Sequence, residues 1–101
     1  MSYRVVLAAA ARAQLDSLYD YIAEAASPAV ALGFTSAILG RLDMLQQFPT
    51  VGVGRDDILP ELRTLGFRRR VTIAFVVEAD QVVVLGLFYG GQDFERLLRE
   101  D

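Results

Sequence analysis

The first half of the chain carries apolar residues at the spacing of two helices. Between Ala9 and about Ala25, one face is apolar, through Leu15, Leu18, Tyr19 and Ile22. A second face carries a charged stripe made of Arg12, Asp16, Asp20 and Glu24. Ser27 and Pro28 supply a capping hydroxyl and a proline at the first helical position, so a second helix is predicted from there to about Gln47. Only EAAS separates the two helices, which therefore form an antiparallel hairpin.

The remaining apolar segments are rich in valine and aromatic residues, which favour β-strands. The predicted strands, the second being the weakest, are Tyr3–Leu7, Leu62–Phe67, Arg70–Glu78 and Gln81–Tyr89. The EADQ link between the last two indicates a tight antiparallel hairpin. The order β-α-α-β-β-β predicts an α+β fold, with the helical hairpin packed on a small, mostly antiparallel sheet. At 101 residues, the chain is expected to form one domain over 1–101.

Both faces of this sheet need cover, because its last two strands are apolar at nearly every position. The helical hairpin can cover one face. A short C-terminal helix, capped by Asp93, offers partial cover for the other, with an apolar side formed by Phe94, Leu97 and Leu98. Its polar side would be stabilised by the i,i+4 pairs Glu95–Arg99 and Arg96–Glu100. The segment GRDDILPEL, residues 54–62, is predicted to be a structured connector.

The composition is more apolar than that of a typical soluble domain. Apolar residues make up 53% of the chain, and the mean hydropathy is +0.34. Two interpretations are open: an exposed apolar patch that meets a partner, or a core that is simply rich in alanine and valine. The longest apolar runs, such as Val82–Tyr89, are too short to span a bilayer, so we expect a cytoplasmic protein with no membrane partner.

The residue types that the chain lacks, together with its net charge, exclude several kinds of chemistry. The chain has no cysteine, histidine or lysine, which rules out disulfides, thiolate metal sites and the commonest general base. Its carboxylates show no metal-binding spacing, so we predict neither a metal nor a cofactor. A net charge of −3 gives no global attraction to nucleic acid, and no direct nucleic-acid binding is expected. All positive charge lies on arginines, which favour bidentate contacts with carboxylate or phosphate.

Segments along most of the chain resemble a known family in order and spacing. They are LDSLYDYIAEAASPAVALGF (Leu15–Phe34), LQQFPTVG (Leu45–Gly52), GRDDILPELRTL (Gly54–Leu65) and RRRVTIAFVVEADQVVVLGLFYGGQDFERLL (Arg68–Leu98). On these residues the chain resembles the RelE/ParE superfamily of bacterial type II toxin–antitoxin toxins, and in particular its ParE-like branch. The resemblance implies the same β-α-α-β-β-β fold. It also implies a cognate ParD-like antitoxin, whose flexible segment wraps the toxin and neutralises it.

The superfamily offers two activities, and the resemblance leaves both open. RelE-like toxins cut mRNA on the ribosome, whereas ParE-like toxins are described as inhibitors of DNA gyrase that are not nucleases. In a nuclease, Tyr89 would stand about where RelE-like toxins carry catalytic groups, assisted by Arg70 and Arg63. A tyrosine, with an ordinary pKa near 10, needs strong cationic help to act as a base. With no histidine or lysine in the chain, the residues therefore favour the non-enzymatic gyrase inhibitor; a fold that only binds its antitoxin is a further alternative.

Candidate contacts with the antitoxin or the target are mostly arginines. They are Arg55, Arg63, Arg68, Arg70, Tyr89, Gln92 and Arg96. Where ParE-like proteins usually place a histidine or other polar residue followed by Arg-Asp, this chain has Tyr89 and Gln92 in place of histidine and arginine. The segment YGGQD could accordingly be only a structural joint between strand and helix. Likewise, Arg55 and Arg63 could simply fix the connector by pairing with its acids, Asp56, Asp57 and Glu61.

Overall fold

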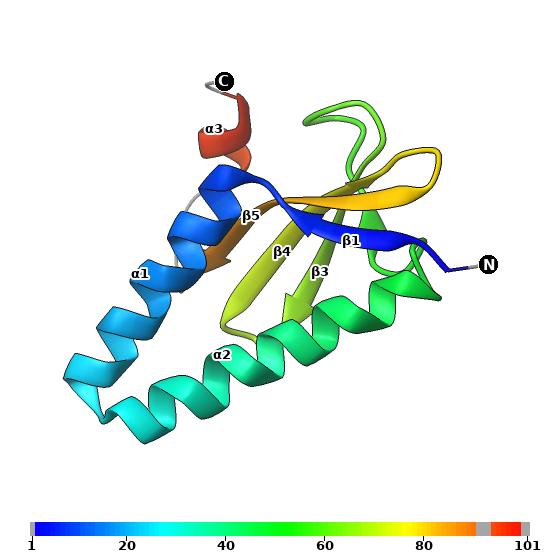
Figure 1. Ribbon diagram of the computed structural model, residues 1–101. Coiled ribbons are helices and arrows are strands. Elements are labelled where there is room, and N and C mark those ends of the chain that lie inside the picture. Colours follow the sequence, from blue (N-terminus) through cyan, green and yellow to red (C-terminus); the bar gives the residue numbers. More distant parts are fainter. Residues whose placement is uncertain (1, 91–93, 100–101) are drawn as a thin grey trace.

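The structure, a computed structural model, describes residues 2–90 and 94–99. Figure 1 shows a helical hairpin lying against one face of a twisted sheet, with a short helix near the C-terminus. The helices are α1 (Ala9–Ala25), α2 (Pro28–Asp43), the 3₁₀ turn η1 (Met44–Gln46) and α3 (Phe94–Arg99). The strands are β1 (Arg4–Leu7), β2 (Val53–Gly54), β3 (Leu62–Phe67), β4 (Val71–Val77) and β5 (Gln81–Tyr89). The predicted α+β class is confirmed.

The sheet has the strand order β1-β5-β4-β3-β2. All neighbouring strands are antiparallel except β1, which runs parallel to β5 with Arg4 beside Gln81 and Leu7 beside Val84. The prediction of a mostly antiparallel sheet is therefore confirmed. The short strand β2 was not anticipated. It consists of Val53 and of Gly54, the first residue of the predicted connector.

The helical hairpin forms as its sequence signals predict. The Ser27 hydroxyl accepts a hydrogen bond from the Val30 amide at 3.1 Å, and Pro28 occupies the first turn of α2. The α-helix ends at Asp43 rather than near Gln47, because the last turn tightens into η1. The continuous stretch Pro28–Gln46 has the length and hydropathy, 1.2, of a possible membrane span. Here it packs one side into the core, through Ala31, Thr35, Ile38 and Leu42.

Two apolar clusters lie on opposite faces of the sheet. The larger cluster joins the helical hairpin to the sheet and is centred on fully buried side chains such as Ile38, Ile73 and Phe75. The smaller cluster covers the other face and consists of Ile58, Leu62, Ala74, Phe88 and Leu98. The second face is therefore covered jointly by the connector and α3.

Helix α3 differs from its predicted amphipathic pattern. Leu98 is buried as expected, but Leu97 is 38% exposed. Glu95 and Arg99, predicted to pair with each other, instead bind connector residues across the fold, as described below. The expected Asp93 cap, the side chain of Phe94 and the Arg96–Glu100 pair lie outside the residues and side chains that the structure describes.

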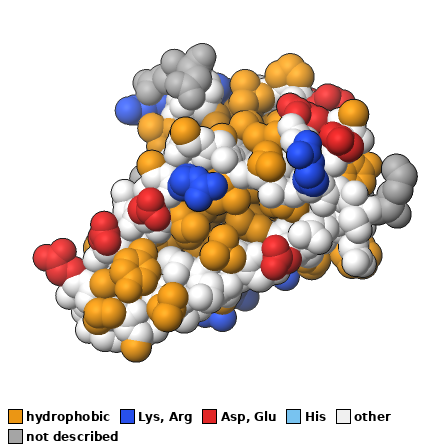
Figure 2. All heavy atoms as spheres, viewed as in Figure 1, with side chains coloured by type: hydrophobic (Ala, Val, Ile, Leu, Met, Phe, Trp, Pro, Cys, Tyr) orange, Lys and Arg blue, Asp and Glu red, His pale blue; other side chains and the backbone are white. Residues whose placement is uncertain are grey.

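The apolar excess of the composition reaches the surface. Figure 2 shows apolar side chains exposed between α1 and α2 and scattered over the rest of this face. The large exposed apolar residues include Val6, Tyr21, Val30, Leu32, Leu39, Phe48, Val53 and Leu97. Apolar side chains are thus exposed at the surface in addition to filling the core, and the patch that meets a partner stays a prediction.

The link between β3 and β4 is a tight turn that holds consecutive arginines. Arg70 was predicted to begin β4, but the strand starts one residue later, at Val71. The Arg70 amide donates to the Phe67 carbonyl at 3.0 Å, and the two residues between them, Arg68 and Arg69, have φ of 50° and 58°. Such left-handed values at both central positions are typical of a type I′ turn, where Asn and Gly are usual. We call Arg68–Arg70 the arginine turn.

Candidate functional site

A β-bulge in β5 decides which side chains reach the helical hairpin. Phe75 of β4 lies opposite Val84, but its neighbour Ala74 lies opposite Gly86, so Leu85 is an extra residue in β5. Up to Val84, the even-numbered residues face the helices; beyond the bulge, Leu87 and Tyr89 do. Without the extra residue, Tyr89 would point to the opposite face of the sheet.

Tyr89 consequently joins a group of aromatic rings at the end of the sheet, where side chains of α1 and α2 meet the last residues of β3 and β5. Its ring centroid lies 5.8 Å from that of Tyr21 on α1 and 6.4 Å from that of Phe34 on α2. Phe34 in turn meets Phe67 of β3 edge to face, with centroids 5.6 Å apart. These are favourable aromatic separations. We call the four residues the aromatic cluster.

The arginine turn lies against this cluster. The Arg68 guanidinium lies 5.0 Å from the ring centroid of Phe67 and 5.7 Å from that of Phe34, within cation–π range. Arg70 reaches the Tyr89 hydroxyl with an Nη1–OH distance of 3.5 Å, at the limit of a hydrogen bond. Among the described residues, no carboxylate forms an ion pair with any of the three arginines. No described acid therefore neutralises the positive charge of the turn.

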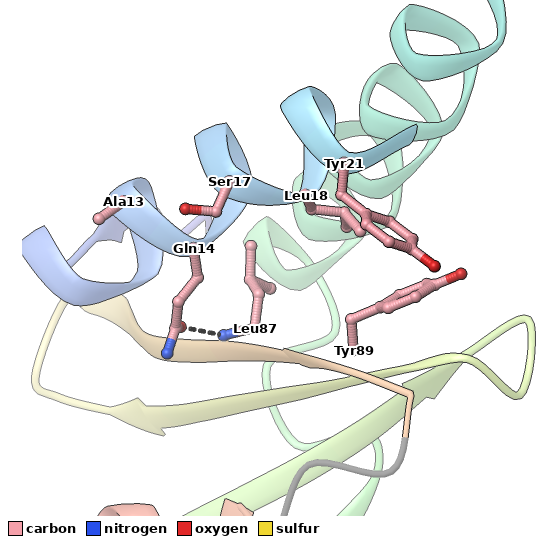
Figure 3. A pocket seen from close by; sticks show the side chains of 7 residues that line it. All are labelled: Ala13, Gln14, Ser17, Leu18, Tyr21, Leu87 and Tyr89. Carbon is pink, nitrogen blue, oxygen red and sulfur yellow. Dashed lines mark hydrogen bonds between the residues drawn. The ribbon is translucent and has the colours of Figure 1, made fainter. Parts of the chain in front are cut away.

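A pocket opens beside the aromatic cluster, between α1 and the end of β5. Figure 3 shows Tyr21 and Tyr89 at one end of it, with Gln14 and Ser17 along the helix. Its volume is about 340 Å³, and its lining consists of Ala13, Gln14, Ser17, Leu18, Tyr21, Leu87 and Tyr89. We call it the tyrosine pocket. This size suits one or two amino-acid side chains or a small ligand.

The back of the tyrosine pocket is a strand edge that no other strand of the described residues covers. β1 pairs with β5 only up to Val84, and the chain then turns into α1. Gln14 compensates, because its Oε1 accepts a hydrogen bond from the Leu87 amide at 2.7 Å (Figure 3). A Cβ at Gly86 would lie 3.3 Å from that same oxygen and 2.5 Å from the ring of Phe88. Glycine therefore permits the close approach of helix and strand here.

The arginines of the connector have a structural role in the fold. Arg55 binds the Asp57 carboxylate through two hydrogen bonds of 2.9 Å and lies 3.2 Å from the Glu95 carboxylate on α3. Arg99 approaches Asp57 at 3.8 Å and also donates to its carbonyl. The hydrogen bond with Asp57 raises the pKa of Arg55, and the Arg55 guanidinium lowers the pKa of Asp57. The interpretation that Arg55 fixes the connector by pairing with an acid is confirmed.

We expect this ion cluster to make the free energy of unfolding fall as the pH is lowered into the acid range. The lowered pKa of Asp57 means that its stabilising contribution is present above the ordinary value of 3.8 and is lost as the pH falls through the lowered value. Urea unfolding between pH 7 and pH 2.5 should therefore show a smaller acid loss for Asp57→Asn than for the wild type. The exposed control Asp16→Asn should follow the wild type. Parallel profiles for Asp57→Asn and wild type would contradict the assignment.

No acid among the described residues pairs with Arg63, contrary to that part of the prediction. Its guanidinium donates to the carbonyls of Val51 at 3.0 Å and Thr50 at 2.5 Å, which ties β3 to the preceding loop. Arg63 is paired with Phe75 on β4, whereas Tyr89 is opposite Val71. Four residues along a strand amount to about 13 Å. The nuclease set of Tyr89, Arg70 and Arg63 is thus only partly assembled, since Arg63 lies apart from the other two.

The remaining candidates are divided by the fold. Arg68 and Arg70 lie together with Tyr89, whereas Arg55 and the exposed Arg96 belong to the connector and α3 on the other side of the molecule. Gln92 lies outside the described residues. No group of three or more acidic side chains suited to a metal is found in the described part of the chain.

Sequence reasoning missed the residues contributed by α1. Ala13, Ser17 and Tyr21 recur every four residues and line the tyrosine pocket as one row of the helix. That row lies directly beside the charged stripe, and it could have been noticed as an uncharged row that ends in an exposed aromatic residue. Tyr21 is in fact 59% exposed.

Comparisons with known proteins agree with this architecture. Residues 5–94 match the family model described as the ParE toxin of the type II toxin–antitoxin system parDE. Among solved structures, the chain is similar to one described as a chromosomal ParDE TA system from P. aeruginosa, with 27% identity and a TM-score of 0.77 over 88% of this chain and 97% of that chain. Among curated proteins, none matches this chain. Because the family model spans nearly its whole length, the chain belongs to the ParE toxin family of type II toxin–antitoxin systems.

Proposed function

We propose that this protein is a cytoplasmic toxin that inhibits DNA gyrase without being an enzyme, and that a ParD-type antitoxin holds it inactive. The observation that carries the proposal is the family match over residues 5–94, joined to the structural likeness to a ParDE system. The apolar side chains exposed between α1 and α2 (Figure 2) support it as well, because an exposed apolar patch often marks a site that a partner covers.

The chemistry of the site supports binding rather than catalysis. Cleavage of RNA through the 2′-hydroxyl requires a base, an acid and cations that meet at one phosphate. The chain has no histidine or lysine, and Arg63 is used to hold a loop far from Tyr89. The arginine turn offers hydrogen-bond donors, and the aromatic cluster offers apolar surface. Arginine and aromatic residues are enriched at protein interfaces.

A supercoiling assay with purified gyrase tests the proposal. The purified toxin is expected to block supercoiling or to accumulate cleaved DNA at micromolar concentration, and adding the antitoxin encoded beside it should restore activity. Gyrase that remains fully active would contradict the gyrase target. In that case, toeprinting on translating ribosomes should be examined with wild type and Tyr89→Phe, since cleavage lost in the variant would identify a ribosome-dependent nuclease instead.

A further inference from the structure

The backbone of the arginine turn is strained at two consecutive residues. Both Arg68 and Arg69 adopt left-handed backbone values that strain residues carrying a side chain. At Arg68, the favourable stacking of the guanidinium on Phe34 and Phe67 offsets part of the cost of this strain. Arg69 is exposed and makes no hydrogen bond, ion pair or ring contact with any described residue. Strain retained with no compensating contact within the chain is typical of a functional position.

The tyrosine pocket lies between opposite charges. On one side, Arg70 reaches the hydroxyl of Tyr89, which lines the pocket. On the other side, the α1 row that lines the pocket is flanked by the exposed acidic row Asp16, Asp20 and Glu24. These acids form no ion pair with a described residue either. The surface is thus apolar in its centre and carries free charges of opposite sign on its two sides.

This pattern indicates the chemistry of the ligand. A nucleic acid presents negative charge along its whole backbone and would be repelled by the acidic row and by the net charge of −3. An amphipathic peptide segment fits better, because it can place an apolar side chain in the pocket and carboxylates against the arginines. Tyrosine and arginine are also the residues that most often dominate binding energy at protein interfaces.

We infer that the tyrosine pocket and the arginine turn together receive an acidic, amphipathic segment of the antitoxin. An apolar side chain of that segment enters the pocket beside Tyr21 and Tyr89, and its carboxylates bind Arg69 and Arg70. Basic residues, where the segment has them, face the acidic row on α1. This inference rests on the proposed function, to which it adds the surface used and the charge pattern of the partner.

Binding of the fluorescently labelled antitoxin, measured by anisotropy, tests the inference with two independent variants. The double variant Arg69→Glu/Arg70→Glu reverses the free charges, and Ser17→Trp fills the pocket from an exposed helical position. Each is expected to weaken binding about tenfold or more. The matched controls Arg41→Glu and Ser36→Trp, on exposed positions of α2, should change it less than about threefold. Raising the NaCl concentration should weaken binding by the wild type more than binding by the double variant.

The outcomes separate this inference from the proposed function. If the antitoxin binds wild type and both variants equally, the surface is wrong while the toxin–antitoxin pairing stands. If the antitoxin does not bind the wild type, the pairing itself fails. Sedimentation of the toxin alone as a dimer that Ser17→Trp abolishes would make a second copy the occupant and overturn the inference. Binding of a labelled oligonucleotide that the double variant abolishes would overturn it in favour of nucleic acid.

Discussion

Phe75→Ala is expected to destabilise the protein by about 3–5 kcal/mol, which is the usual range for deleting a buried phenylalanine. Phe75 is fully buried at the centre of the larger cluster, on the middle strand β4. Removing its ring leaves a cavity between the sheet and the helical hairpin, which the surrounding side chains fill only in part. A domain of this size has a total stability of only about 5–15 kcal/mol, so the substitution removes a substantial part of it and should lower the urea midpoint strongly.

Urea unfolding monitored by circular dichroism measures this loss. The same substitution at Phe48, whose side chain is 57% exposed, provides the control and should change stability by no more than about 0.5 kcal/mol. Equal stabilities for the two variants would show that Phe75 is not at the centre of the core.

Gly52→Ala is expected to cost about 2–4 kcal/mol, a large effect for the addition of one methyl group. Gly52 has a φ of 85°, and a Cβ there would collide with the carbonyl oxygen of Thr64. That oxygen belongs to the backbone of β3, which is held in the sheet by β4 and cannot move aside. The substitution therefore strains the backbone and separates β2 from β3 at the same time.

A second glycine supplies the comparison. Gly33 lies within α2, and an added Cβ would meet no atom within 4 Å. Gly33→Ala should therefore raise the free energy of unfolding by about 1 kcal/mol, because alanine favours the helix. The two Gly→Ala variants are expected to shift the thermal midpoint in opposite directions. Shifts of the same sign would contradict the conformational account of Gly52.

Local signals in the sequence were strong for the helices and strands. Ser27 and Pro28 mark the start of α2, and the charged stripe on α1 identifies the exposed side of the helical hairpin. The EADQ hairpin between β4 and β5 also follows from sequence, with Val77 opposite Val82. The order of elements then restricts the fold to a helical hairpin on a sheet. The pairing of Arg55 with Asp57 was predictable because the two residues are close in the chain.

The candidate site was only partly predictable. Tyr89, Arg68 and Arg70 were identified individually, but their partners Tyr21, Phe34 and Phe67 come from three other elements. Their arrangement also depends on the backbone of the arginine turn, because Arg68 and Arg69 adopt left-handed values that no local sequence signal indicates.

The sequence alone was enough to locate the main helices and strands, though not the short strand β2, because capping residues, turn residues and apolar periodicity act over a few neighbouring positions. Tertiary structure alone decided that β1 lies parallel to β5 and that Leu85 bulges from the sheet. The bulge reverses the faces of all later residues in β5, and so brings Tyr89 under the helical hairpin. A strand that is apolar at nearly every position carries no alternation to reveal such a shift; only packing against both faces of the sheet fixes it.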